Sequence, residues 1–248
     1  MDGQEEQWLL KEKYRGEPSE AFFADCKRLA LGEPLGYLIG HVPFLDCTIY
    51  LDSRPLIPRP ETEYWTEEAI AEIKTVTPAS EVPRILDLCA GSGCIGVAVA
   101  KEIADAQVDF SEIDESHLST IAKNLQLNNI VPERTTVKHT NLFTDFAGTY
   151  NFILSNPPYI DMDLKRTDTT VLEHEPYIAL SGGIAGLEVI QKIIEEAPKH
   201  LERHGQLWIE HEPEQSAEIR NLAREHKFIC TTHHDQYGVE RYSVLVLQ

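Results

Sequence analysis

From residue 84 onward, short apolar runs alternate with longer segments whose apolar residues recur at helical spacing. Runs of four to eight apolar residues indicate buried strands, and apolar positions three and four residues apart indicate helices. We expect seven strands, at residues 85–88, 107–112, 135–139, 151–155, 206–210, 228–232 and 242–247. We expect helices at residues 94–104, 116–128, 187–200 and 214–226, with Gly205 stopping the third. This alternation predicts an α/β fold, with a mostly parallel sheet between two layers of helices. The last two strands are joined by a short loop, so we expect them to pair antiparallel.

The first 80 residues have a different pattern. Residues 5–30 show helical patches broken by Gly16 and Pro18, and residues 42–51 form two short strand-like runs typical of a hairpin. A helix then begins at Pro60, with acidic residues in its first turn, where the helix dipole favours them. We therefore predict a short helical segment at residues 1–31, a β-hairpin and connector at 32–60, and the α/β domain at 61–248.

Composition narrows the classes of function. The 248 residues include 22 basic and 41 acidic side chains, a formal net charge of −19. A protein that grips a phosphate backbone usually presents a basic face, so we expect no direct nucleic-acid partner. The five cysteines are scattered without a C-x-x-C pair, which indicates free thiols and no metal site. The apolar stretches are too short to span a membrane, and the acidic N-terminus resembles no targeting signal, so we expect a cytoplasmic protein without a membrane partner.

A glycine-rich turn follows the first predicted strand of the α/β domain. Gly91, Gly93 and Gly96 have G-x-G-x-x-G spacing, and Glu112 ends the next strand, where an acid can bind a ribose diol. Both a nicotinamide dinucleotide and S-adenosylmethionine fit this pattern. Asp87, at the entrance of the turn, would repel a pyrophosphate but would suit a cationic methionine group, which favours S-adenosylmethionine.

The fourth predicted strand ends in a stiff, acceptor-rich sequence, Ser155-Asn-Pro-Pro-Tyr159. The prolines donate no hydrogen bond, and each holds the preceding residue extended. Asn156 Oδ1 and the Pro157 carbonyl are candidate acceptors for the two N–H bonds of a planar NH₂ group, and Tyr159 is a candidate wall beside it. Orienting a weak nitrogen nucleophile toward a methyl donor supplies about 7–11 kcal/mol in favourable cases. We predict Asn156, Pro157 and Tyr159 as catalytic residues.

Two further segments, PRPETE (residues 58–63) and HEPYIALSGGIAGLEVI (residues 174–190), accompany this motif. From about residue 32 to near the C-terminus, the chain resembles the HemK/PrmC release-factor glutamine methyltransferases. The resemblance implies a Rossmann-like class I methyltransferase dependent on S-adenosylmethionine, with an antiparallel last strand in its seven-stranded sheet. It also implies methyl transfer to N5 of the glutamine in the Gly-Gly-Gln motif of peptide chain release factors. The expected partner is therefore a release factor, and we expect the enzyme to be a monomer.

The resemblance also assigns roles to the candidate residues. It implies a cofactor site in which Glu112 binds the ribose, Leu142 lies against the adenine, Asn156 faces the reacting end, and the methionine part is held by Cys89, Ala90, Gly91, Ser92 and Gly93. The glutamine would be held by Asn156, Pro157, Pro158 and Tyr159. The chain departs from the family pattern in a few places: Cys89 and Ala90 replace a glycine and a threonine, Glu112 an aspartate, and Leu142 an aromatic residue. Only about thirty residues precede the hairpin, where family members usually carry a multi-helix domain.

Three alternatives stay open. The first is an amino-methyltransferase acting on adenine or cytosine in nucleic acid, which the acidic charge and the PRPETE segment disfavour. The second is a cofactor-binding protein without catalysis, and the third a nicotinamide-dependent oxidoreductase. Two local questions stay open as well. One is whether Arg59 and Glu61 brace the pocket or only begin a helix. The other is whether Glu173 and Glu175 order a loop or contact the substrate, or are only solvated.

Overall fold

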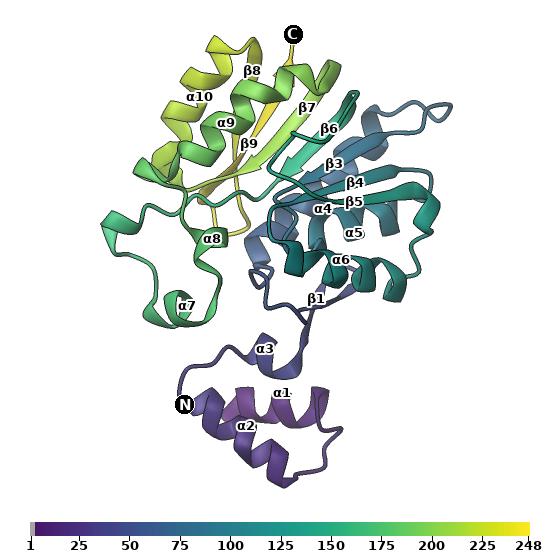
Figure 1. The fold of residues 1–248 in the computed structure, drawn as a ribbon. Coiled ribbons are helices and arrows are strands. Elements are labelled where there is room, and N and C mark those ends of the chain that lie inside the picture. The colour runs from purple at the N-terminus through teal and green to yellow at the C-terminus, as the bar shows by residue number, and fades with distance from the viewer. Residues whose placement is uncertain (1–2) are drawn as a thin grey trace.

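The computed structural model describes residues 3–248, and its N-terminal part is a small group of three helices (Figure 1). These helices are α1 (Gly3–Glu12), α2 (Glu20–Ala30) and α3 (Leu35–Ile39). They enclose a core of their own around Leu9, Phe22 and Leu38. The sequence predicted helix in residues 5–30 but did not predict α3, which lies in the range expected to be hairpin and connector.

The predicted hairpin is present and lies against a helix of the α/β domain. Strands β1 (His41–Phe44) and β2 (Cys47–Tyr50) pair antiparallel. Asn128 accepts a hydrogen bond from the Thr48 amide (3.1 Å) and donates one to the Thr48 carbonyl (2.9 Å). Asn124 does the same with Tyr50, at 2.8 and 3.1 Å. The two asparagine amides thus cover the free edge of β2 as a further strand would.

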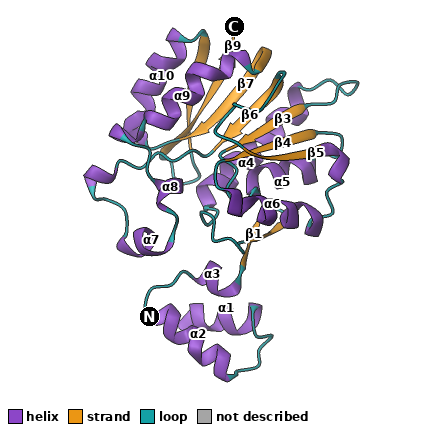
Figure 2. Ribbon diagram, viewed as in Figure 1, coloured by secondary structure: helices purple, strands orange, loops and turns teal. Residues whose placement is uncertain are grey.

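All seven predicted strands of the main sheet are present (Figure 2). They are β3 (Arg84–Leu88), β4 (Gln107–Glu112), β5 (Thr135–His139), β6 (Tyr150–Ser155), β7 (Leu201–Glu210), β8 (Phe228–His234) and β9 (Glu240–Leu247). Their order is β5-β4-β3-β6-β7-β9-β8. Only β9 runs antiparallel to its neighbours, β7 and β8, which confirms the predicted antiparallel last strand.

Helices cover both faces of the sheet, and each face has its own core (Figure 1). One layer consists of α4 (Pro60–Val76), α5 (Cys94–Glu102) and α6 (Glu115–Leu127). The other consists of α9 (Glu188–Glu196) and α10 (Ser216–Glu225). Along β3, Ile85 packs into the first core and Leu86 into the second, as the alternation of side chains in a strand requires.

The helix expected at residues 187–200 is shorter, and Gly205 does not end it. Helix α9 ends at Glu196 and passes into the 3₁₀ turn η4 (Ala197–Lys199), and β7 already begins at Leu201. Pro198 is the reason, because a proline removes a helical hydrogen bond and clashes with the preceding turn. Gly205 instead lies within β7, in the irregular stretch where the pairing with β6 shifts register.

The chain leaves the sheet most extensively after β6. This segment contains η2 (Met162–Leu164), α7 (Thr169–His174), α8 (Tyr177–Leu180) and η3 (Ile184–Gly186), and Figure 1 shows it extending toward the N-terminal helices. Two further 3₁₀ turns, η1 (Pro132–Arg134) and η5 (Pro213–Gln215), precede β5 and α10. The three predicted parts of the chain, with boundaries at residues 31 and 60, remain a proposal.

The strand order places a crevice at one defined position. The chain builds the sheet outward from β3 through β4 to β5, then returns to the other side of β3 with β6. Ligands of open α/β sheets bind beyond the carboxyl ends of the strands at such a reversal. Leu88 pairs with Ser155, so the loops that follow β3 and β6, which carry the two predicted motifs, lie side by side.

We predict that Asn128→Ala lowers the free energy of unfolding by about 1–3 kcal/mol, because both backbone groups of Thr48 lose their partner. Gln126→Ala is the matched control, since Gln126 is exposed on the same helix, and it should change the stability by less than about 0.5 kcal/mol. Urea unfolding measures both. Equal stability of the two variants would show that the asparagine does not hold the hairpin.

Candidate active site

A cavity of about 490 Å³ lies at the predicted crevice. The predicted site residues that line it are Cys89, Gly91, Glu112, Leu142, Asn156 and Pro158. Ala90, Ser92 and Gly93 form the turn without lining the cavity, and neither Pro157 nor Tyr159 lines it. Helices α8 and α9 form a wall that the sequence did not reveal, with Tyr177, Ile178, Glu188 and Lys192. A cavity of this size is typical of a small-molecule site.

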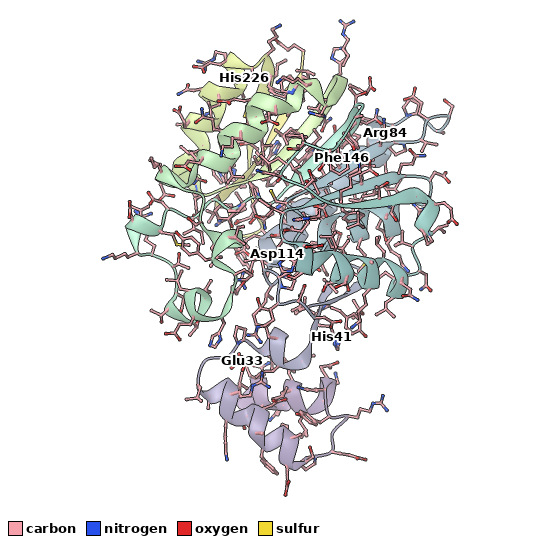
Figure 3. All side chains as sticks on the ribbon, in the orientation of Figure 1. Glu33, His41, Arg84, Asp114, Phe146 and His226 are labelled. Carbon is pink, nitrogen blue, oxygen red and sulfur yellow. The ribbon has the colours of Figure 1, made fainter. Side chains whose placement is uncertain are left out.

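The glycine turn is shaped by left-handed backbone and held by Glu112. The φ angles of Cys89, Gly91 and Gly93 are 63°, 55° and 77°. No heavy atom lies within 4 Å of the position that a Cβ on Gly91 would take, so a ligand can approach the backbone there. Glu112 is 6% exposed and accepts hydrogen bonds from the amides of Gly91 and Asp114, both at 2.7 Å. Asp114 in turn caps α6 beside the site (Figure 3). The Glu112 carboxylate therefore fixes the turn, and each of its oxygens still has a lone pair that can accept a hydrogen bond from a ligand.

Asp87 and Cys89 lie deep at the base of this turn. Asp87 is fully buried; its Oδ2 accepts a hydrogen bond from the Gly96 amide (2.8 Å), and its Oδ1 has no partner within residues 3–248. Burial raises the pKa of Asp87 to about 8. Burial and the neighbouring Glu112 raise the pKa of the Cys89 thiol far above its usual value. A thiol held protonated is a poor nucleophile, so these surroundings favour a packing role for Cys89, which is half-buried and lines the cavity.

The motif after β6 is anchored to a buried carboxylate, Glu210, at the end of β7. Asn156 Nδ2 donates to Thr62 Oγ1 (3.2 Å), and Thr62 Oγ1 donates to Glu210 Oε2 (2.7 Å). The same oxygen accepts from Trp65 Nε1 (2.6 Å), and Glu210 Oε1 accepts from the Tyr159 hydroxyl (2.9 Å). Burial raises the pKa of Glu210 despite these hydrogen bonds, and burial together with the Glu210 charge raises the pKa of Tyr159 well above its usual value.

The PRPETE segment also holds the wall of the cavity. Arg59 forms an ion pair with Glu175, and the Ile57 amide donates to the same carboxylate (3.2 Å). Glu175 is buried and lies two residues before α8 begins at Tyr177. On the other side, Gln215 Nε2 donates to the carbonyls of Tyr159 (2.8 Å) and Ala185 (3.1 Å). Arg59 and Glu175 therefore brace the site, which answers the two local questions for these residues, whereas Glu173 is exposed.

The residues present fit S-adenosylmethionine. The open approach to Gly91 suits a ligand that lies against the backbone, and the Glu112 carboxylate, placed at the end of β4, suits a ribose diol. Leu142 adds an apolar surface to the cavity. Within residues 3–248, no three His, Cys, Asp or Glu side chains are grouped to hold a metal ion, and no helix is long and apolar enough to cross a membrane.

The fold and the site define a class I methyltransferase, and comparisons with known proteins agree. A model of the "Methyltransferase small domain" family matches residues 73–174. A methyltransferase from Pyrococcus furiosus has a TM-score of 0.60 at 18% identity, over 90% of this chain and 97% of its own. Magnesium protoporphyrin IX methyltransferase from Synechocystis, solved with bound SAM, has a TM-score of 0.53 at 14% identity, over 80% of this chain and 89% of its own. These likenesses concern the fold.

Sequence relatives define the family more closely. The release factor glutamine methyltransferase of Lactococcus lactis is 32% identical, over 94% of this chain and 84% of its own length. That of Rhodopirellula baltica is 35% identical, over 83% and 70%. The chain belongs to the release factor glutamine methyltransferase family. A ribosomal protein uL3 glutamine methyltransferase from Bradyrhizobium diazoefficiens is 29% identical, over 73% of this chain and 58% of its own.

We predict that Gly96→Ala destabilises the protein by about 1–3 kcal/mol, because an added Cβ would lie 2.3 Å from Cε1 of the buried Phe110 ring. Gly3→Ala is the control, since no atom lies within 4 Å of its added Cβ. Thermal unfolding measures both variants. Equal melting temperatures would show that helix α5 does not depend on this close approach.

We predict that Asp87 makes the protein less stable as the pH rises from about 4 to about 8. The folded chain keeps the Asp87 proton up to a pKa of about 8, whereas the unfolded chain releases it near the ordinary value of 3.8. The folded state therefore binds more protons in this window, and stability falls by up to about 1.4 kcal/mol per pH unit. Asp87→Asn should remove this part of the slope in urea unfolding at pH 5, 6, 7 and 8. An unchanged slope would mean that Asp87 ionises normally.

Proposed function

We propose that this protein methylates the side-chain amide nitrogen N5 of the glutamine in the Gly-Gly-Gln motif of a peptide chain release factor. As a member of its family the protein is a methyltransferase, and S-adenosylmethionine is the methyl donor. The observation that carries the substrate is the Asn156 end of the cavity. There the amide nitrogen of Asn156 is engaged by Thr62, and its oxygen stays available to accept from an NH₂ group.

The site works by orientation. Asn156 Oδ1 and the Pro157 carbonyl accept the two N–H bonds of the glutamine carboxamide, and the Tyr159 ring walls it from solvent. Pro157 and Tyr159 adjoin the lining residues Asn156 and Pro158 without lining the cavity themselves, so this assignment places the carboxamide at the Asn156 edge of the cavity. The acceptors leave the nitrogen lone pair directed away from them, toward the cofactor part of the cavity. When bound, S-adenosylmethionine would supply an electrophilic methyl group: the N–C bond would form as the S–CH₃ bond breaks, the leaving group would be the neutral thioether, and the nitrogen would lose one proton to water. No strong base is required beforehand, because the nitrogen becomes acidic only as it gains the methyl.

We assign the parts of the cofactor to the residues predicted from the sequence. We assign the ribose to Glu112, the adenine to Leu142, and the methionine part to the turn from Cys89 to Gly93. Ala90 and Ser92 contribute through the backbone of this turn, because their side chains are buried beneath it. Pro158 lines the cavity near Asn156.

A second candidate substrate is a glutamine in a ribosomal protein, favoured by the relative named for uL3. The chemistry at Asn156 would be the same, and only the protein that carries the glutamine would differ. The release factor is preferred because the relatives that carry its name match this chain over a greater length.

The test is methyl transfer measured by mass spectrometry, with S-adenosylmethionine and one of four acceptors. These are a bacterial release factor, the same factor with alanine in place of the Gly-Gly-Gln glutamine, ribosomal protein uL3, and an adenine-containing oligonucleotide. We expect a methyl group on the first acceptor alone. Asn156→Ala should lower the rate at least about a hundredfold, because the nitrogen loses its orienting acceptor.

Asn221→Ala is the matched control, since this exposed asparagine lies on α10 and bonds only Glu218 within the described chain. It should leave the rate unchanged. A methyl group on uL3 alone would select the second candidate. Modification of the oligonucleotide alone would overturn the proposal in favour of a nucleic-acid enzyme.

A further inference from the structure

We propose that Glu210 and Thr62 are positioning residues that determine which end of the Asn156 amide faces the substrate. An asparagine amide has an acceptor end and a donor end of nearly equal size, so packing alone does not select one orientation. The reaction requires the acceptor end in the cavity. This inference rests on the proposed function, since it concerns the group that would hold the glutamine.

Glu210 Oε2 determines which atom donates and which accepts in each hydrogen bond that leads to Asn156. This oxygen accepts from Trp65 Nε1 at 2.6 Å and from Thr62 Oγ1 at 2.7 Å. An indole N–H can only donate, so Oε2 must remain an acceptor. A proton taken up by the carboxyl group would have to reside on Oε1, beside Tyr159, and would leave Oε2 unchanged. The start of the chain of hydrogen bonds is therefore independent of the ionisation of Glu210.

Thr62 in turn determines which end of the Asn156 amide it contacts. Its hydroxyl group has a single hydrogen, and Glu210 takes it, so toward Asn156 the hydroxyl offers only lone pairs. The Asn156 group at 3.2 Å must therefore be the NH₂. Its oxygen, Oδ1, has no hydrogen-bond partner within residues 3–248, and Asn156 lines the cavity. The reverse orientation would place two acceptors against each other.

With Glu210 ionised, Tyr159 is oriented in the same sense by the other oxygen of this carboxylate. Its hydroxyl donates to Oε1 at 2.9 Å, so the phenol hydrogen points away from the cavity. The substrate end of the site thus presents acceptors, and it should discriminate strongly against a group that has no N–H to donate. A site built to pair a substrate N–H rejects an analogue without it by about 10⁴–10⁵-fold.

The interior location makes the arrangement rigid. Glu210, Trp65 and Thr62 are 0%, 0% and 1% exposed, so water does not offer alternative partners. Thr62 and Trp65 lie three residues apart on the first turns of α4, on one face of the helix. The threonine of the PRPETE segment, Thr62, therefore has a specific chemical role. Its single hydroxyl group links the Glu210 carboxylate at the end of β7 to the Asn156 amide after β6.

The experiment compares three full-length variants: Thr62→Val, Thr62→Ser and Thr66→Val. Thr62→Val removes the hydroxyl at similar volume, and Thr62→Ser restores it. Thr66→Val removes a second buried hydroxyl one turn along the same helix, where Thr66 donates only to the Thr62 carbonyl. Melting temperature and S-adenosylmethionine affinity by calorimetry establish that each variant is folded and binds cofactor.

Two readouts follow. The first is kcat and KM for the release factor: we expect Thr62→Val to lower kcat about ten- to a hundredfold with KM within about threefold, because docking is unchanged while the acceptor is misplaced. Thr62→Ser should recover most of that loss, and Thr66→Val should remain within about twofold of the wild type. The second is the side-chain NH₂ signal of Asn156 in protein labelled with ¹⁵N-asparagine. It should shift in Thr62→Val and return in Thr62→Ser.

A Thr62→Val enzyme with an unmoved Asn156 signal and a kcat within twofold of the wild type would overturn the inference. So would an equal loss of kcat in Thr62→Val and Thr66→Val, because the effect would then be structural. The NMR readout requires no substrate. If the wild-type enzyme methylates no release factor, the proposed function fails while the orientation of Asn156 is still tested.

Discussion

The carboxylate of Glu210 has no contact with solvent, and its hydrogen bonds determine how the reacting end of the molecule is assembled. Removing a carboxylate from water costs several kcal/mol unless donors replace the lost hydration. The donors here are Thr62 and Trp65 on α4 and Tyr159 after β6. The end of β7, the start of α4 and the loop after β6 are therefore placed together. Displacing α4 or the loop after β6 would take donors away from the buried carboxylate.

The acidic residues of the site serve positioning throughout. Glu112 holds the amides of Gly91 and Asp114, Asp87 holds that of Gly96, and Glu175 holds Arg59 and the Ile57 amide. None of these contacts places a base next to the Asn156 acceptor. This agrees with a reaction in which the nucleophile needs orientation, because an amide nitrogen becomes acidic only after it has gained the methyl. These three carboxylates are therefore accounted for by the backbone groups and the arginine that they hold in place.

The sequence predicts those parts of the molecule that depend on local pattern. The seven strands, the glycine turn, and the position of Asn156 after β6 follow from short apolar runs and their adjacent polar residues. Pro198 is a local signal that should have ended α9 before residue 200. Helix α3 was missed because it is a single short element of five residues, whose apolar side chains find their partners only in the folded chain: Leu38 packs with α1 and α2, and Tyr37 packs with the hairpin and connector.

The bond from Thr62 to Glu210 could not be predicted in the same way, because it joins residues 148 positions apart. A partial signal exists: Glu210 is a charged residue at the carboxyl end of an apolar strand, and such ends meet at the crevice of a parallel sheet. That rule places the carboxylate near the site, but it does not identify the threonine, which sits at the start of a helix. Helix α4 reaches the crevice only through the hairpin and connector, whose course depends on tertiary contacts.

The connector also joins the short N-terminal segment to the cavity. Glu33 pairs with Arg28 of α2 and with Arg54 of the connector, at 2.7 and 3.0 Å. A few residues on, Arg59 holds Glu175, which precedes the cavity wall formed by α8. The N-terminal helices and the wall of the cavity are thus fastened to one stretch of backbone, residues 54–59. Contacts in the N-terminal helices and contacts in the cavity wall therefore meet in the same few residues of the chain.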